Sequence, residues 1–472
     1  MITEDFILNT AHTNHLAGAR YVLFAALVMM LAGCSDSGSS SGPLSAELAA
    51  ACENHDGGGI NREAIALTGV GLRKGCEGLH HYNLFEPATE DGDFSLGDPR
   101  RPAHGGFPFV LNARLFSDYT LKHRAVFLPE DEAGNPIPGS FRAADGDVGK
   151  AQDNFLFPVG TVIAKTFTYP DTSSGTPTER IIETRLLIKH DNHDNGEFWE
   201  GLPYIWAQDA GGRWRASLQR TGGKFYDGAW HYEEPFGSGE DFSGQSDEFG
   251  YTIPGASQCS NCHSNRDQDP GSAPIGLKAR MLNRPYASEF SQFTNDPAEL
   301  IGRNQIDYWT EQGWLVDIEP QAYTLDNETQ VITDIERIQP YMIPADHNNP
   351  DADLTERARG YLMVNCAHCH NPGGRRVNNR YMDDIRDICD SNFVINVFGT
   401  LIKPGEDARE SSVFTRMARP AQVTAEDQEK LIEEGFTESA MPQSGRQLVH
   451  IQGRELLREW IEGMDPAICN SD

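Results

Sequence analysis

Two short motifs that combine cysteine with histidine constrain this chain more than any other feature of its sequence. The first is CSNCH, starting at Cys259, and the second is CAHCH, starting at Cys366. In each motif two residues separate the thiols, and a histidine follows the second thiol directly. Such residues serve three kinds of site: a zinc site, a redox dithiol and a covalently attached haem.

The spacing of the two motifs favours haem. Structural zinc sites usually place their cysteine pairs about 15–20 residues apart, and these motifs lie much farther apart. A zinc ion that bridges both pairs remains an alternative. A redox dithiol would follow a strand in a βαβ unit, and no such unit is visible. Haem c uses all three residues, because two thiols bond its vinyl groups and the histidine ligates its iron. The sequence therefore predicts two covalently bound haem c groups, held by Cys259, Cys262 and His263 and by Cys366, Cys369 and His370.

The N-terminal segment predicts export. Arg20 precedes an apolar run that has the length of a signal-peptide core and is too short to span a membrane well. The run ends in LAGC at Cys34, which resembles the lipobox of bacterial lipoproteins, a family in which this cysteine is acylated. An ordinary secretory signal is the alternative. We predict a signal peptide over 1–33, a lipid anchor on Cys34 and a Ser/Gly-rich tether over 34–51, with the protein facing the periplasm or the surface, at the outer membrane.

Charge and the remaining cysteines fit this location. The net charge of −31 excludes nucleic acid as a partner, because like charges repel, and is compatible with a basic redox protein or with a solvated acidic surface. An oxidising periplasm permits disulfides. Proximity along the chain favours pairing Cys52 with Cys76 and Cys389 with Cys469, although sequence alone does not fix connectivity.

Residues 52–295 are predicted to be rich in β-structure. Runs of β-branched and aromatic residues at 161–169, 180–190 and 202–209 read as strands, and turn residues separate them. The segment DNHDNG after the second run is predicted as a hairpin turn, because Leu202 stands where a calcium loop needs its glutamate. Short strands at this spacing favour an antiparallel sandwich or a barrel-like fold.

The C-terminal part is predicted to be helical, after a linker with short helices over 296–350. Within 351–472, Asp353 and Glu356 have the spacing of a capping box at the start of a helix that ends at the second motif. Mostly apolar residues fall on one side of this helix at helical spacing, and apolar residues form one face of a second helix near the C-terminus. These two faces consist of Leu354, Ala358, Tyr361, Leu362 and Asn365 and of Leu456, Leu457, Trp460, Ile461 and Met464.

This module resembles class I cytochrome c, in which the first and last helices cross beside the haem and a Met-Pro loop supplies the sixth iron ligand. By that resemblance Met441 is the ligand opposite His370, Met417 is the rival, and Ala358 is the small residue at the crossing. For the first motif the sixth ligand stays open. The candidates are Met281, His123, His190 and His231, or an open coordination position.

From about Gly78 to Met464 the chain resembles a family of exported dihaem c-type cytochromes, often encoded beside a parallel β-helix protein. The strings LNARLFSDYTLKHRAVFLP, QCSNCH and RARGYLMVNCAHCHNPGG are among those that carry the likeness. It implies fold and cofactor but no reaction, and the segment around Cys389 departs from it.

We therefore expect a multidomain lipoprotein that relays single electrons between redox partners in the periplasm or at the cell envelope, and no catalytic residue is predicted. Two alternatives remain. One is a haem enzyme of the peroxidase or oxidase type, which would use an open position at the first haem. The other is a binding module in which the β-rich part recognises a ligand and the cytochrome is an electron outlet.

Overall fold

The structure is a computed structural model that describes residues 45–53, 58–69, 75–88, 93–142, 154–171, 178–192, 196–220, 224–227, 250–255, 259–263, 274–286, 300–316, 321–325, 328–332, 346–370, 401–418, 440–442 and 446–468. Several predicted features lie outside these residues: the signal peptide, Cys34, His231, Cys389 and Cys469. Among the described residues, none of the helices has the length and apolar character needed to cross a membrane.

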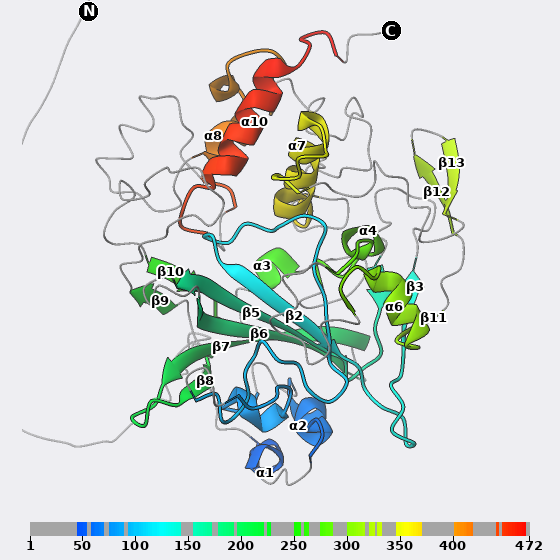
Figure 1. Cartoon of the computed structure of the whole chain (residues 1–472), viewed down its shortest axis with the longest axis vertical. Helices are drawn as coiled ribbons and strands as arrows, with labels where there is room; N and C mark the ends of the chain where they lie inside the picture. The colour runs from blue at the N-terminus through cyan, green and yellow to red at the C-terminus, as the bar shows by residue number, and fades with distance from the viewer. Residues whose placement is uncertain are drawn as a thin grey trace, which may run out of the picture. The chain divides into compact units, whose positions relative to one another are not determined.

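A six-stranded antiparallel sheet forms the centre of the fold (Figure 1). Its order is β1 (Phe107–Pro108), β2 (Leu121–Phe127), β5 (Val162–Asp171), β6 (Thr178–Asn192), β7 (Gly196–Gln208) and β8 (Trp214–Leu218). The three strands predicted from β-branched runs are its middle strands, β5, β6 and β7, so that prediction is confirmed. The predicted hairpin is also confirmed, because Asn192 pairs with Gly196 across the turn between β6 and β7.

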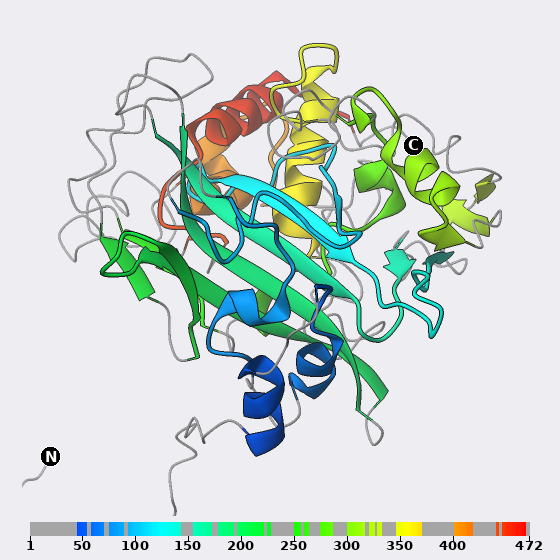
Figure 2. The same ribbon diagram turned by 60° about the horizontal axis from the view of Figure 1, so that its bottom comes forward.

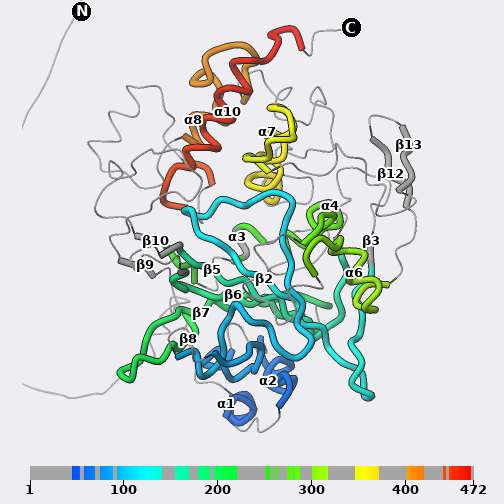
Figure 3. Tube along the Cα trace, viewed as in Figure 1, coloured from blue at the N-terminus to red at the C-terminus, as the bar shows by residue number. Residues whose placement is uncertain are grey.

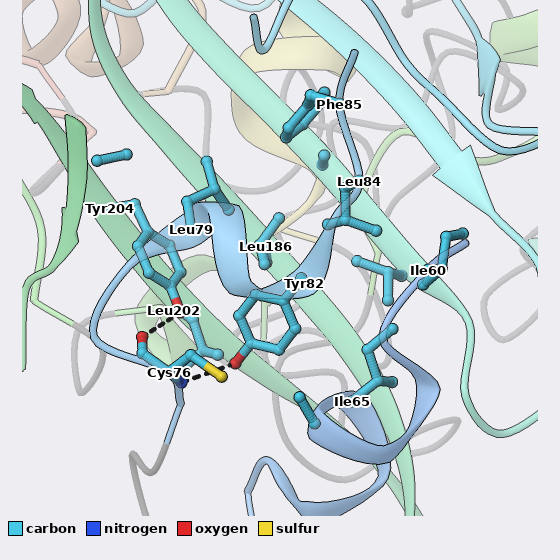
Figure 4. Packing of buried hydrophobic residues seen from close by; sticks show 14 of the residues in the cluster. Ile60, Ile65, Cys76, Leu79, Tyr82, Leu84, Phe85, Leu186, Leu202 and Tyr204 are labelled. Carbon is cyan, nitrogen blue, oxygen red and sulfur yellow. Dashed lines mark hydrogen bonds between the residues drawn. The ribbon is translucent and has the colours of Figure 1, made fainter. Parts of the chain in front are cut away.

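The first face of the sheet packs against the N-terminal helices, α1 (Ala46–Glu53), α2 (Arg62–Leu67) and η1 (Leu79–Tyr82). Figure 4 shows this core, in which Tyr204 donates a hydrogen bond to the carbonyl of Cys76 and the backbone N–H of Cys76 donates to Tyr82. A disulfide joins Cys76 to Cys52, the pairing favoured by proximity. Helix α1 overlaps the end of the predicted tether over 34–51. That part of the prediction is wrong, because Leu48 of α1 is fully buried in this core.

The second face of the sheet is covered by α4 (Ala279–Leu282), α6 (Gln305–Glu311) and a small mixed sheet of β11 (Leu315–Val316), β3 (Gly139–Arg142) and β4 (Asn154–Leu156). Trp309 of α6 is fully buried against Phe107. Helices therefore flank the large sheet on both faces. Among the described residues it is an open sheet, and neither a two-sheet sandwich nor a closed barrel forms. Two further hairpins are β9 (Lys224–Asp227) with β10 (Gly250–Ile253) and β12 (Gln321–Leu325) with β13 (Glu328–Ile332).

The C-terminal part is helical. It consists of α7 (Leu354–Leu362), which continues into one π-helical turn, η7 (Met363–Ala367), then η8 (Ala408–Glu410), α8 (Ser412–Met417) and α10 (Ile451–Gly463). The predicted capping box is confirmed, because the Asp353 side chain accepts from the Glu356 N–H and Glu356 accepts from the Asp353 N–H. Figures 1 and 2 both place α7 and α10 on the opposite side of the sheet from α1 and α2.

Hydrogen bonds join the helical part to a segment just before β2, within the compact unit Pro43–Asp472. Asp118 accepts from the backbone N–H groups of Gln447 and Leu448 at 2.7 and 2.8 Å. Tyr119 donates to the carbonyl of Val449 and accepts from the N–H of Ile451. The start of α10 is therefore fixed by residues that lead into the central sheet.

Candidate functional site

The first motif forms one helical turn beside the central sheet. The carbonyl of Cys259 accepts from the N–H groups of Cys262 and His263 at 3.3 and 3.0 Å, and α3 (Ser260–His263) covers the rest of the turn. Gly201 of β7 makes room for the first thiol, because a Cβ atom at this position would lie 2.9 Å from the Sγ atom of Cys259. The sheet thus fixes the position of the motif.

The second motif adopts the same turn. The carbonyl of Cys366 accepts from the N–H groups of Cys369 and His370 at 3.1 and 2.9 Å. Residues four apart on a helical turn lie on the same side, so in both motifs the first cysteine and the histidine lie on one face. The π-helical turn η7 leads into this motif, and such turns are frequent at functional sites.

A buried asparagine anchors the second motif from the residue before it. Asn365 is 5% exposed, accepts from the N–H of Phe116 at 2.8 Å and donates to the carbonyl of Tyr361 at 2.9 Å. Because Phe116 belongs to the segment before β2, the motif at the end of α7 is attached to the β-rich part of the chain as well as to its own helix.

The two motifs meet in space. One ligand atom each from Cys262, His368 and Cys369 lies within 4.8 Å of the other two, so a thiol of the first motif lies against a thiol of the second. Figure 3 shows α3 between the sheet and the end of α7 that carries the second motif. Sequence reasoning did not predict this meeting, and it treated His368 as a spacer. The signal that could have found it was His368 itself, a potential metal ligand between Cys366 and Cys369.

The four motif cysteines are free of disulfides and fall into two pairs by environment. Burial raises the pKa of the Cys259 thiol to about 11 and that of the Cys366 thiol to about 12. A hydrogen bond with Cys369, and a weaker one with His368, lowers the pKa of the Cys262 thiol to about 3. Each motif therefore contributes one enclosed thiol and one thiol at the junction.

Met441, the predicted sixth ligand, lies in a loop that Arg416 and Arg446 hold by hydrogen bonds. Its N–H donates to the carbonyl of Arg416 at 2.9 Å, and its carbonyl accepts two hydrogen bonds from Arg446. The positive charge of Arg446 also acts on Cys366, where it lowers the pKa of the thiol. Burial raises the same pKa and is the larger effect. Nothing in the sequence pattern pointed to a role for Arg446. The rival, Met417, is buried among the apolar side chains of α7 and α10, the usual role of a core methionine.

The other candidates for the first motif have contacts of their own. Met281 is buried in the same cluster as Met417. His123 is hydrogen-bonded to the carboxylate of Glu179 at 2.5 Å. His190 packs beside Phe198, and burial lowers its pKa to about 4, so it is neutral at pH 7. The structure brings the motif residues together, but it leaves the sixth position of the first motif without an assigned ligand.

Comparisons of the chain with protein-family models, with curated proteins and with solved structures found no match. The functional proposal that follows therefore rests on the geometry of the two motifs.

Proposed function

We propose that this protein is an exported dihaem c-type cytochrome that relays single electrons at the cell envelope. The observation that carries the proposal is the pair of CxxCH turns, which share the same backbone hydrogen bonds, have cysteines outside any disulfide and meet at Cys262 and Cys369. The donor set fits the group, because each turn offers two thiols and a histidine close to one another in a single turn of backbone.

Haem c bound at these turns would supply one-electron redox chemistry. In the second motif, Cys366, Cys369 and His370 would hold the haem, and Met441, in the loop held by Arg446, would be the further ligand that the resemblance to class I cytochrome c implies. A thioether opposite a histidine favours the reduced iron and raises the potential. The crossing of α7 and α10 supports this proposal, because Gly453 of α10 lies directly under the ring of Tyr361. The position is close to that of Ala358, which is fully buried.

The meeting of the motifs supports a relay. Two groups attached to adjacent thiols would lie close together, and an electron passes most readily between centres in near contact. The acidic chain, with a net charge of −31, favours a periplasmic redox partner that presents a basic surface, since complementary charge speeds association. The lipid anchor predicted at Cys34 would hold this exchange at the membrane surface.

The haem content of the purified protein tests this proposal. Expression with a c-type maturation system is expected to yield two haems per chain by intact mass and by the absorbance of the pyridine complex. Replacing both cysteines of the first motif (C259A with C262A) is expected to leave one haem, and so is the matched change in the second motif (C366A with C369A). A haem-free wild-type chain from cells that mature another cytochrome c would contradict the proposal.

One observation favours a second candidate, a thiolate metal site that joins the two motifs. Cys262, His368 and Cys369 supply two thiols and an imidazole at a distance that suits a single ion such as zinc. This candidate predicts about one metal ion per chain and no haem absorbance. It also predicts that His368→Ala releases the metal, whereas the haem proposal predicts that this variant keeps two haems. Elemental analysis beside the absorbance spectrum therefore separates the candidates.

A further inference from the structure

A large cavity lies beside the start of β2, and one of its lining residues, Phe116, is hydrogen-bonded to the residue before the second cysteine motif. Its volume is about 790 Å³, and its walls come from residues 110–124, the turn 346–350 and the start of α10. Cavities that bind small molecules in proteins usually have volumes of about 300–1,000 Å³. The cavity is therefore large enough for a small organic molecule.

The walls of this cavity carry more positive than negative side chains, in a chain that is strongly acidic as a whole. Its cations are Arg114, Lys122, Arg124 and Arg284, and its carboxylates are Glu179 and Asp346. Both carboxylates are engaged by the protein itself. Glu179 accepts from His123 and from Thr168 at 2.8 Å, and Asp346 accepts from Arg114 at 3.1 Å.

Two of these cations, Lys122 and Arg124, form no ion pair with a carboxylate of the described residues. Lys122 donates instead to the carbonyl of Thr120 at 2.6 Å, and Arg124 makes one long hydrogen bond of 3.5 Å to the carbonyl of Lys122. Their burial is costly, since burial lowers the pKa of Lys122 well below its usual value and that of Arg124 to about 10.

The neighbouring strands increase this cost. Arg124 on β2 stands directly opposite Lys165 on β5, and Lys165 stands directly opposite Arg185 on β6. Like charges in directly opposed positions destabilise a sheet. Only Arg185 has a bound carboxylate, that of the fully buried Glu183. The arrangement leaves positive charge at the cavity wall that an anion would neutralise.

We propose that this cavity binds a small organic anion with two or more carboxylate groups, and that Lys122 and Arg124 are its charge partners. The stacked rings of Phe116 and His450, 4.3 Å apart, give the same cavity a flat wall for the carbon skeleton of the ligand. The site goes beyond electron relay, and the experiment below distinguishes it from a pocket that holds haem propionates.

The wall also connects the cavity to the second motif. Phe116 donates its N–H to Asn365, the residue before Cys366, and His450 forms a hydrogen bond of 3.2 Å with Tyr361 of α7. A bound anion would therefore contact residues that position the second motif.

Calorimetric titration of the full-length, matured protein with citrate tests the proposal. We expect one saturable site, with affinity reduced about tenfold in Lys122→Met and in Arg124→Met, because each variant loses a charge-assisted hydrogen bond. Lys122→Arg is expected to keep most of the affinity. Lys403→Met is the matched control, because Lys403 pairs with Glu410 on another part of the surface, and it is expected to bind citrate like the wild type.

Three results would overturn the proposal. The first is the absence of saturable citrate or succinate binding to the wild-type protein. The second is inorganic phosphate binding as tightly as citrate, which would indicate a simple oxyanion site. The third is binding only to protein prepared without haem, which would assign the cations to haem propionates. A methionine variant that fails to fold is recognised by its circular dichroism spectrum. In that case two results still test the proposal: the affinity of Lys122→Arg for citrate, and the fall in wild-type affinity that added salt is expected to cause.

Discussion

At the scale of single residues, the candidate site depends on small and polar side chains that shape the space around the motifs. Gly201 leaves room for Cys259, Asn365 anchors the second motif, and Arg446 holds the Met441 loop. The sequence predicted the cysteines, the histidines and Met441, because each carries chemistry by its type. It did not predict the three supporting residues, because a glycine, an asparagine or an arginine acquires such a role only through contacts distant in the sequence.

Gly201→Ala tests the fit between the first motif and the sheet. The new methyl group would lie 2.9 Å from the Cys259 Sγ atom, so the turn has to move away from β7. We expect lower haem occupancy at the first motif, unchanged occupancy at the second, and a loss of about 1–3 kcal/mol in the free energy of unfolding. Mass spectrometry of proteolytic peptides measures the two occupancies. Gly58→Ala, at a position with open space around the new methyl group, controls for loss of a glycine, and equal occupancy in the two variants would contradict the expectation.

At the scale of elements, local pattern predicted well wherever one face is buried. The runs that became β5, β6 and β7, the capping box of α7 and the apolar face of α10 were all visible in the sequence. Helix α1 was missed, because the predicted Ser/Gly-rich tether runs into it and a short helix depends on the packing of Leu48. The open sheet replaced the expected sandwich, because the helices that bury its two faces come from distant parts of the chain.

The crossing of α7 and α10 makes a prediction at this scale. A Cβ atom at Gly453 would lie 2.4 Å from the ring of Tyr361, so Gly453→Ala pushes the two helices apart. We expect the free energy of unfolding to fall by about 1–3 kcal/mol. Gly463→Ala, at the end of the same helix, has open space around the new methyl group and is expected to be neutral or slightly stabilising. Chemical denaturation of the two variants measures the difference, and equal stability would show that the helices do not pack this closely.

At the scale of the whole molecule, the β-rich and helical parts contact each other through Asp118, Tyr119 and Phe116, which bind the start of α10 and the second motif. The sequence pattern distinguished these parts by the change from strand to helix periodicity. Periodicity indicates which elements form, but it carries no information on which of them are in contact. The meeting of Cys262 with Cys369 lay beyond sequence reasoning for the same reason.

This connection predicts cooperative unfolding. We expect one thermal transition when circular dichroism of strands and helices and the absorbance of the haem proposed at the second motif are followed together. Asp118→Ala leaves the N–H groups of Gln447 and Leu448 without their acceptor, so it is expected to lower the free energy of unfolding by about 1–3 kcal/mol and to separate the two signals. Asp131→Ala removes a carboxylate whose hydrogen bonds stay within one exposed turn, and is the control. Two transitions in the wild-type protein would contradict this account.

The contact between Cys262 and Cys369 also has a consequence for biosynthesis. In an oxidising compartment, two thiols so close in the folded chain can bond to each other, and a cross-link between the motifs would then block both attachment sites. If the motifs carry haem as proposed, its attachment would therefore have to precede the final docking of α3 on α7. Alkylation of chains made without haem reports the order of events, since a protected Cys262–Cys369 pair would mark protein that folded before it matured.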